Sequence, residues 1–251
     1  MIALNLTRQM AAAKTFAAIF FILISGTAVG AQALSVLPVT ILLSPGQKTT
    51  SLTITNQGTT ETAVQIRAYA WSQKNDDGDI QLSSTNMVVL SPPLARIAPG
   101  ASQVVRLILR MTPETKEETY RILIDQVPPP AEPGVVHLVL RLSIPIFAPP
   151  PIRSFSDVQF HLERDADHIY LVAMNTGNLH DVIRNIALTT SDGRKLEPES
   201  GGATPYILSG ATRRWRFVLK DPLPPQTDTL RLTAKTDASA IDEQVRFVAA
   251  R

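Results

Sequence analysis

The sequence contains no cysteine, and this absence removes several classes of function at once. Without thiols the chain cannot form disulfides, bind metals through thiolates or use a cysteine nucleophile. Charged residues are also scarce, at 18% of the 251 residues, and they leave a formal net charge of only +2. Because acidic and basic residues are interspersed, we expect no nucleic-acid partner and no polybasic membrane patch.

Catalytic and metal-binding motifs are equally scarce. The G-x-S-x-G, H-E-x-x-H and P-loop patterns do not occur, and the four histidines form no ligand pair at helical spacing. His161 and His168 lie in an expected hairpin with the acidic residues Glu163, Asp165 and Asp167. A solvated charged turn explains this hairpin, and a metal site there is the alternative. We therefore predict that the protein is not an enzyme and that it binds neither a cofactor nor a metal.

The N-terminus is typical of an export signal. A basic flank precedes the apolar stretch 15–24 (TFAAIFFILI), which is shorter than the roughly 20 residues that a membrane-spanning helix needs. We predict that residues 1–33 are a signal peptide, and the rival interpretation is an uncleaved membrane anchor. Small residues before Ala31 and before Leu34 offer cleavage after Gly30 or after Ala33. After cleavage we expect no stable membrane insertion.

From residue 34 onward the chain has the pattern of a β protein. Apolar and polar residues alternate, β-branched residues are frequent, and Gly, Pro or Asn interrupts the pattern about every ten residues. Such a succession of short strands is typical of an immunoglobulin-like sandwich. The expected strands cover residues 34–43, 48–56, 63–71, 87–90, 95–97, 101–111, 118–128 and 135–147, and then 156–162, 169–175, 181–190, 206–208, 213–219, 229–236 and 245–249.

Three consecutive prolines, Pro149 to Pro151, mark the best domain boundary. Proline has no backbone N–H, so a strand cannot run through this segment. We predict an all-β fold of two immunoglobulin-like β-sandwich domains, residues 34–148 and 154–251, joined by a Pro-rich linker at residues 149–153. Within the second domain, the polar stretch 235–243 predicts a mobile loop.

The segment 135–147 (VVHLVLRLSIPIF) needs a cover for one of its faces. It is long for an ordinary strand, and its other face is mixed rather than polar. From the pattern alone, the apolar row has three possible covers: the core of its own domain, the second domain or a partner chain. Counted with period 2, the row consists of Val136, Leu138, Leu140, Leu142 and Ile144.

A succession of short motifs resembles the periplasmic pilus chaperones of the PapD-like family. The resemblance covers residues 33 to about 150 in order and with matching spacing. A weaker similarity follows in the second domain at 175–178 (NTGN) and 206–210 (YILSG). The motifs of the first domain are Ser91-Pro92-Pro93, 95–100 (ARIAPG), 104–107 (VVRL), 120–129 (YRILIDQVPP) and 144–147 (IPIF).

This resemblance implies a boomerang-like pair of domains that acts in the periplasm by donor-strand complementation. A pilus or fimbrial subunit lacks its last strand, and the chaperone lends its own seventh strand until the subunit reaches an outer-membrane usher. The apolar row Val136, Leu138, Leu140, Leu142 and Ile144 would then lie in the subunit's groove. The alternative function is a secreted structural or adhesive two-domain β-sandwich protein, in which the same row is core.

The sequence also departs from the best-known members of the family. They carry an Arg and a Lys that together grip the subunit's C-terminal carboxylate, and these positions are Thr40 and Pro145 here. The family's Arg before the closing proline is replaced by Pro149, which puts the usual interdomain ion pair in doubt.

These departures resemble the archaic branch of the family, whose clients look like spore-coat-protein-U-type subunits. A buried carboxylate without a partner costs several kcal/mol, so another base must replace the lost pair if the anchor survives. Arg121 is the first candidate because it lies in the strand next to the donor strand. Arg96, Arg106 and Arg141 follow.

The signal peptide predicts the mature N-terminus. N-terminal sequencing of the exported protein should find Ala31 or Leu34 as the first residue. An intact Met1 on the exported protein would show instead that residues 1–33 are retained.

Overall fold

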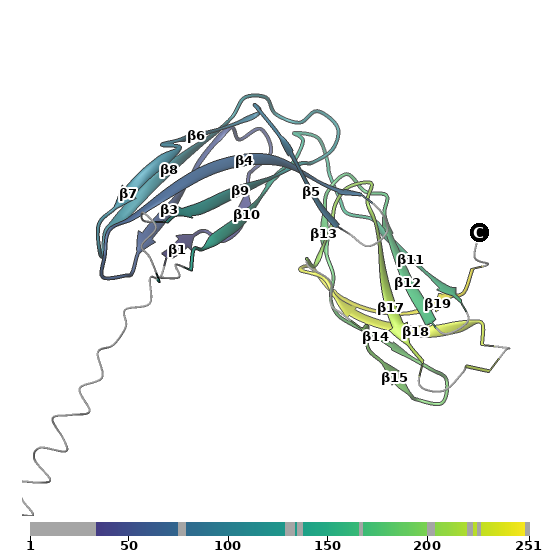
Figure 1. Cartoon of the computed structure of the whole chain (residues 1–251). Coiled ribbons are helices and arrows are strands. Elements are labelled where there is room, and N and C mark those ends of the chain that lie inside the picture. Colours follow the sequence, from purple (N-terminus) through teal and green to yellow (C-terminus); the bar gives the residue numbers. More distant parts are fainter. Residues whose placement is uncertain are drawn as a thin grey trace, which may run out of the picture.

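The computed structural model is a two-lobed β protein. It describes residues 34–74, 79–128, 134, 138–165, 168–199, 204–219, 223–224 and 227–248, so the expected signal segment lies outside it. Every helix or strand among these residues is a β-strand, which confirms the predicted all-β class. The strands form two groups that share no ladder, and the two lobes are set at an angle (Figure 1). Within these ranges no helix is long and apolar enough to span a bilayer.

The first lobe is a sandwich of two sheets. One sheet has four strands in the order β1-β3-β8-β6, and the other has the order β2-β10-β9-β4-β5 with β7 also paired to β4. The four-stranded sheet consists of β1 (Leu34–Leu37), β3 (Thr49–Asn56), β8 (Ser102–Leu109) and β6 (Val88–Ser91). The six-stranded sheet consists of β2 (Ile41–Leu42), β10 (Arg141–Ala148), β9 (Glu118–Val127), β4 (Thr62–Lys74), β5 (Asp79–Ser84) and β7 (Leu94–Ile97).

Alternation along the strands decides which side chains form the core of this lobe. On β9, Ile122 and Ile124 point into the sandwich and are fully buried, as are Val105 and Leu107 on β8. Successive side chains of a strand point to opposite faces, so Arg121 must lie on the outer face of the six-stranded sheet. Trp71 and Phe147 lie on the same outer face, and both pack with the hydrophobic cluster of the second lobe.

The first expected strand divides into two. The segment 34–43 contributes β1 to the four-stranded sheet and β2 to the six-stranded sheet. Pro38 lies between them and cannot donate to a ladder, so pairing breaks at this point. The strand β2 pairs in parallel with the end of β10, with Ile41 opposite Ile146 and Leu42 opposite Phe147.

The second lobe has shorter strands in three sheets. These have the orders β11-β12-β17, β13-β16 and β15-β14-β18-β19, and a parallel bridge joins Leu162 to Phe247. The strands are β11 (Val158–Arg164), β12 (His168–Asn175), β13 (Asp181–Val182), β14 (Arg184–Thr189), β15 (Lys195–Leu196), β16 (Tyr206–Ile207), β17 (Thr212–Val218), β18 (Thr229–Lys235) and β19 (Ala240–Arg246).

Two strands contradict the expectations from sequence. The stretch expected to be a mobile loop contains the start of β19, which pairs along its whole length with β18. This strand looks polar because it is an exposed edge, where Arg231 donates hydrogen bonds of 2.7 and 2.6 Å to Asp242. The strand β5 was not expected at all, and it pairs with the end of β4, which is longer than predicted.

The two lobes share part of their cores. Trp71 of β4 and Phe147 of β10 are buried, and they pack with the hydrophobic cluster of the second lobe. The segment that follows the prolines then packs against the 175–178 turn. At Gly177 an added Cβ would lie 2.5 Å from the backbone nitrogen of Asp157 and 2.5 Å from the carbonyl oxygen of Phe155.

Replacing Gly177 by alanine should therefore destabilise the protein. The two backbone atoms that the Cβ would meet belong to a hydrogen-bonded segment, so the main chain must shift, and we expect a loss of about 3 kcal/mol in unfolding free energy. Gly193→Ala is the control, because its Cβ meets nothing within 4 Å and only its φ of +86° is strained. That strain costs about 1 kcal/mol. Equal losses in urea denaturation of the two variants would contradict the packing argument.

Candidate functional site

An apolar segment next to the first sandwich is exposed to solvent. Leu138 is 90% exposed, Leu140 is 41% exposed, and Val139 between them is also exposed. Three successive large apolar side chains without cover are unusual on a monomeric protein and mark an interaction site. Val136, which precedes them in the expected apolar row, lies outside the described residues.

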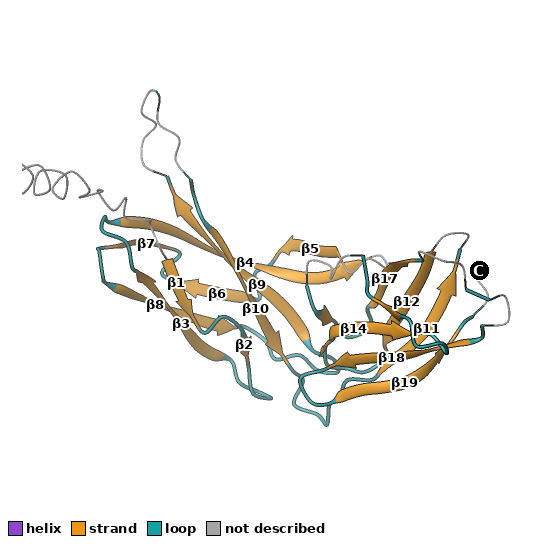
Figure 2. Ribbon diagram, turned by 90° about the horizontal axis from the view of Figure 1, so that it is seen from below, coloured by secondary structure: helices purple, strands orange, loops and turns teal. Residues whose placement is uncertain are grey.

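The strand that follows this segment has an open edge. β10 pairs with β9 from Arg141 to Ala148, but on its other side β2 pairs only with Ile146 and Phe147. Figure 2 shows β9 and β10 side by side in this sheet. Among the described strands, the backbone of residues 141–145 therefore has no neighbour on one side. Such an edge can accept a strand from another chain.

The expected apolar row does not point outward along its whole length. Ile144 is only 6% exposed and belongs to the core of its own domain, and Leu142 is half-buried against the same core. The reason is that β10 is fully paired with β9 from Arg141 onward, so its even-numbered side chains fill the sandwich. The expectation is thus corrected: within the described residues, only Leu138 and Leu140 of this row are open to a partner, with Leu142 at the border.

A glutamine side chain holds the point where the exposed segment meets the sheet. The backbone N–H of Gln126 donates to the carbonyl of Leu140 at 2.9 Å, and the N–H of Leu140 donates to Oε1 of Gln126 at 3.3 Å. The same carboxamide donates to Thr62 Oγ1 at 3.1 Å. Leu140 is thereby fixed at the end of the ladder. Nothing in the sequence pattern singles out Gln126, because a glutamine at a strand end is common.

Arg121 is a buried cation on the outer face of the same sheet. It is 8% exposed, its guanidinium carbon lies 4.1 Å from the ring centroid of Trp71, and its Nη1 donates to Ser143 Oγ at 3.1 Å. Burial lowers the pKa of Arg121, and Tyr206 opposes part of that change. No carboxylate contacts it among the described residues. A desolvated guanidinium without a counter-ion is suited to bind an anion.

The position of Arg121 agrees with a role beside the lost lysine. In the ladder it is directly opposite Pro145 of β10, the position at which the resemblance places a lysine in the best-known members. Thr40 lies between β1 and β2. Arg121, from the neighbouring strand, therefore places a positive charge beside Pro145, which has none of its own.

The other three candidate arginines have less suitable surroundings. Arg141 shares the carboxylate of Asp125 with Arg67, which lies 2.6 Å from it. Burial alone would raise the pKa of Asp125, but hydrogen bonds from Arg67 and Arg141 hold that pKa below its usual range. Arg96 is exposed and lies 3.4 Å from Glu61 on β7's side of the sheet, whereas Arg106 lies on β8 of the other sheet.

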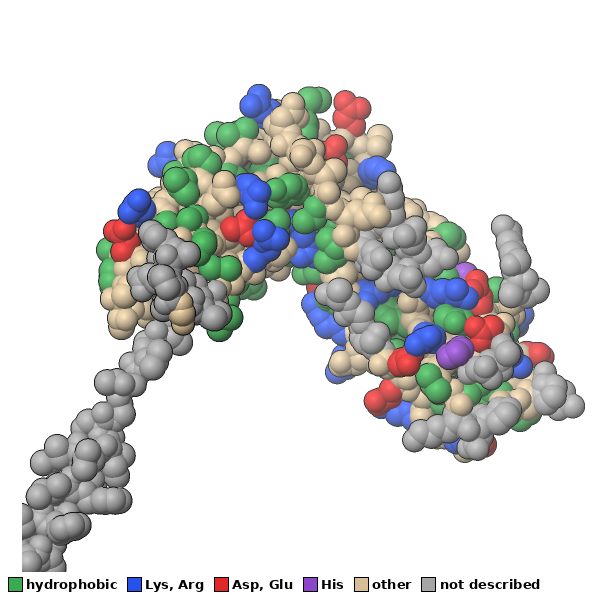
Figure 3. Space-filling model, viewed as in Figure 1, with side chains coloured by type: hydrophobic (Ala, Val, Ile, Leu, Met, Phe, Trp, Pro, Cys, Tyr) green, Lys and Arg blue, Asp and Glu red, His purple; other side chains and the backbone are tan. Residues whose placement is uncertain are grey.

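The surface near the bend is accordingly positive. Lys and Arg side chains gather on the lower side of the first lobe, towards the bend (Figure 3). Arg67, Arg121 and Arg141 lie on the outer face of the six-stranded sheet. Among the described residues, Arg67 and Arg141 form ion pairs with the same acid, Asp125, and Arg121 forms none. An anionic group on this face would therefore be attracted by the positive charges around Arg121.

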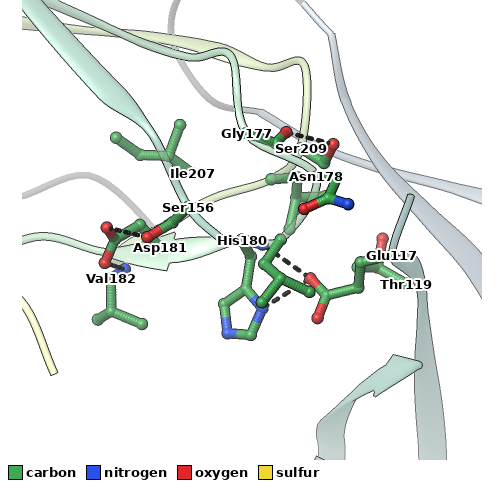
Figure 4. A network of polar contacts seen from close by, with 12 residues as sticks. Glu117, Thr119, Ser156, Gly177, Asn178, His180, Asp181, Val182, Ile207 and Ser209 are labelled. Carbon is green, nitrogen blue, oxygen red and sulfur yellow. Dashed lines mark hydrogen bonds and ion pairs between the residues drawn. The ribbon is translucent and has the colours of Figure 1, made fainter. Parts of the chain in front are cut away.

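Glu117 and His180 form one of the contacts between the lobes. The Nδ1–H of His180 donates to Glu117 Oε2 at 2.6 Å, and the backbone N–H of His180 donates to the same oxygen at 2.9 Å (Figure 4). The imidazole also stacks on Phe147, with 3.6 Å between ring centroids. Pro149 had put the interdomain ion pair in doubt, and this histidine provides a different interdomain partner for a glutamate.

The hairpin considered for metal binding does not gather ligands. His161 lies 3.4 Å from Glu163, and His168 lies 3.3 Å from Asp165. Glu163 also accepts a hydrogen bond from Arg214 at 2.6 Å, so its charge already has a partner. Asp167 lies outside the described residues, and the described ones contain no group of three or more His, Cys, Asp or Glu that could hold a metal ion.

Comparison with solved structures identifies the fold. The chaperone CsuC, in complex with the tip adhesion subunit CsuE of Csu pili from Acinetobacter baumannii, is 20% identical with a TM-score of 0.61, covering 87% of this chain and 100% of that chain. The SafB chaperone of Salmonella enterica, solved with the SafA pilin, is 16% identical with a TM-score of 0.55, covering 88% and 98%. These similarities confirm the predicted two-domain β-sandwich fold.

Sequence comparison identifies the family. The chaperone protein FimB/FhaD of Bordetella pertussis is 27% identical over 139 residues, which are 48% of this chain and 54% of that protein. The chain thus matches about half the length of this curated relative. Residues 33–152 match the pili and flagellar-assembly chaperone family through its PapD N-terminal domain. The N-terminal part of the chain, residues 33–152, therefore has the N-terminal domain of the PapD-like pilus chaperones, a family of periplasmic chaperones rather than of enzymes.

Proposed function

We propose that this protein is a periplasmic chaperone that binds pilus subunits by donor-strand complementation and delivers them to an outer-membrane usher. The observation that carries the proposal is the exposed segment Leu138 to Leu140, which leads directly into the open edge of β10. Relatives with the same fold were solved bound to a tip adhesion subunit and to a pilin. The export signal expected at residues 1–33 supports a periplasmic location.

The geometry of the edge suits an added strand. A subunit strand beside residues 141–145 would form backbone hydrogen bonds with β10, and the preceding residues would extend this pairing away from the sandwich. Alternate side chains of the exposed segment would then enter the subunit's groove. Backbone pairing makes the binding general for incomplete sandwiches, and the side-chain row fixes the register.

The apolar row alone does not provide strong binding. Burying Val136, Leu138 and Leu140 contributes roughly 1.5 to 3 kcal/mol for each side chain. Association and ordering cost about 4 to 15 kcal/mol, which offsets most or all of the roughly 4.5 to 9 kcal/mol that the three side chains contribute together. Backbone pairing and a polar anchor must supply the net affinity. The corrected, shorter row therefore makes the anchor more important than a row of five would.

Arg121 is the proposed anchor for the subunit's C-terminal carboxylate. It has the contacts expected of one: the Trp71 ring holds the guanidinium from below, and Ser143 orients one nitrogen. A carboxylate would supply the counter-ion that it lacks among the described residues and would offset its desolvation. The absence of a basic residue at Thr40 and Pro145 supports assignment to the archaic branch, with spore-coat-protein-U-like subunits as clients.

The donor row can be tested with a charge. Leu138→Asp or Leu140→Asp should abolish recovery of bound subunits, because a carboxylate would enter an apolar groove. Each pilus-subunit homologue encoded in the same genome is tagged, co-expressed with the chaperone and purified from the periplasm. Val139→Asp, on the other face, is the matched control and should reduce recovery less. If no tagged homologue recovers the wild-type chaperone, the secreted structural or adhesive protein becomes the better explanation.

The anchor can be tested on the subunit that this screen recovers. Arg121→Ala should lower its recovery strongly, and Arg121→Lys should fall between, since lysine lacks the planar fork that binds a carboxylate in two places. Arg96→Ala and Arg106→Ala are the controls and should bind as the wild type does. Unchanged recovery in both Arg121 variants would exclude this residue and leave Arg141 as the candidate on the same face.

A further inference from the structure

We propose that Glu117 and His180 are positioning residues for Arg121, so that the contact between the two lobes sets the place of the anchoring guanidinium. This inference rests on the anchor role proposed above. It concerns residues that do not touch the carboxylate themselves. We expect that disturbing the contact between Glu117 and His180 moves Arg121, although two other side chains separate His180 from Arg121.

A continuous chain of side-chain contacts joins the two places. The imidazole of His180 stacks on Phe147, with 3.6 Å between centroids and 14° between the ring planes. Phe147 packs edge-on against Trp71 at 5.7 Å, and the guanidinium of Arg121 lies 4.1 Å above the Trp71 ring. Tyr206 of the second lobe closes the group, at 5.6 Å from Trp71 and 5.1 Å from Phe147.

The contact also holds the two strands that carry the site. Glu117 immediately precedes β9, four residues before Arg121, and its backbone N–H donates to the carbonyl of Asn178 at 2.8 Å. Phe147 belongs to β10, two residues after Pro145. Because Arg121 and Pro145 are opposite each other in the ladder, His180 holds the adjacent ends of both strands.

The hydrogen-bonded pair has the burial expected of a fixed contact. The side chain of Glu117 is 3% exposed and that of His180 is 16% exposed. One carboxylate oxygen accepts from both the ring and the backbone N–H of His180, which leaves the carboxylate little freedom. Removing the imidazole would leave this acid buried with fewer partners, so the local structure has to rearrange.

Other contacts keep the lobes together when this pair is removed. Gln73 donates to the carbonyl of Tyr206 at 2.8 Å and accepts from the N–H of Leu208 at 2.9 Å. The side chain of Asn178 donates to the carbonyl of Thr115 at 3.2 Å. Variants of Glu117 and His180 should therefore stay folded with docked lobes, and a change at Arg121 can be measured in them.

The position of Arg121 can be read directly by NMR in the free chaperone. A guanidinium above an indole face experiences the ring current, so the Nε–H signal of Arg121 should be shifted upfield. In the ¹⁵N-labelled mature chain, Arg121→Lys assigns this signal and Trp71→Leu shows how much of the shift the indole causes. His180→Leu and Glu117→Gln should each lose most of the upfield shift, while the backbone spectrum of the two lobes stays dispersed.

Two further variants separate positioning from general destabilisation. His180→Phe keeps a ring against Phe147 but loses the bond to Glu117, so it should retain more of the shift than His180→Leu. His168→Leu removes a histidine–acid contact that lies within the second lobe, that with Asp165, and should leave the Arg121 signal unchanged. An Arg121 signal at its wild-type position in both His180→Leu and Glu117→Gln would overturn the proposal, and Glu117→Gln alone decides it if His180→Leu does not fold.

Subunit recovery then distinguishes this inference from the proposed function. If Arg121→Ala lowers recovery, His180→Leu should lower it too but add nothing in the Arg121→Ala background, because both act through one guanidinium. Additive losses would overturn the positioning role while leaving the anchor intact. Unchanged recovery in Arg121→Ala would refute the anchor, and the NMR result would still stand as a statement about the free chaperone.

Discussion

The strand β10 has to satisfy three requirements with one stretch of backbone, and the rest of the structure follows from this. It pairs with β9 along its whole length and fills the first core with Ile144 and Ile146. It packs Phe147 into the core of the second lobe, and it leaves the edge of residues 141–145 open. A strand that is fixed on one edge and at one end can offer its other edge without unfolding. This is the condition that an edge for another chain requires.

The exposed leucines before β10 depend on the fixed point at which this strand begins. Gln126 holds Leu140 at the end of the ladder, so the apolar segment begins at a defined point instead of slipping along β9. A register slip by one residue would turn the apolar row to the opposite face. Buried core residues at one end and a fixed amide at the other thus give the open segment a single register. An isolated apolar edge without these constraints would favour aggregation over selective binding.

Much of the fold could be predicted from sequence because strand alternation and proline positions are local signals. The row of Leu52 and Ile54 on β3, for example, alternates with Ser51 and Thr53 and shows its buried face directly. The end of the free apolar row could not be predicted, because Ile144 and Leu138 look alike in a period-2 pattern and differ only in which strand lies beside them. The start of β19 was missed for the opposite reason, since its side chains are polar at an exposed edge. Arg121 could be proposed from its place in the neighbouring strand, whereas Gln126 and His180 act through contacts between distant segments.

In the proposed function, replacing a basic pair by Arg121 would alter how the anchor is held. A lysine in the donor strand would depend on that strand for its position and would carry a flexible stem. Arg121 lies instead on β9, between β4 and β10, and its guanidinium rests on an indole that is itself packed between the two lobes. Its desolvation is already present before any ligand arrives, because it is only 8% exposed and contacts Trp71 and Ser143. Binding a carboxylate there requires little further ordering of the arginine, and this reduces the entropy that the anchor must offset. The affinity of the proposed anchor would therefore depend on the packing between the lobes, which a lysine on the donor strand would not require.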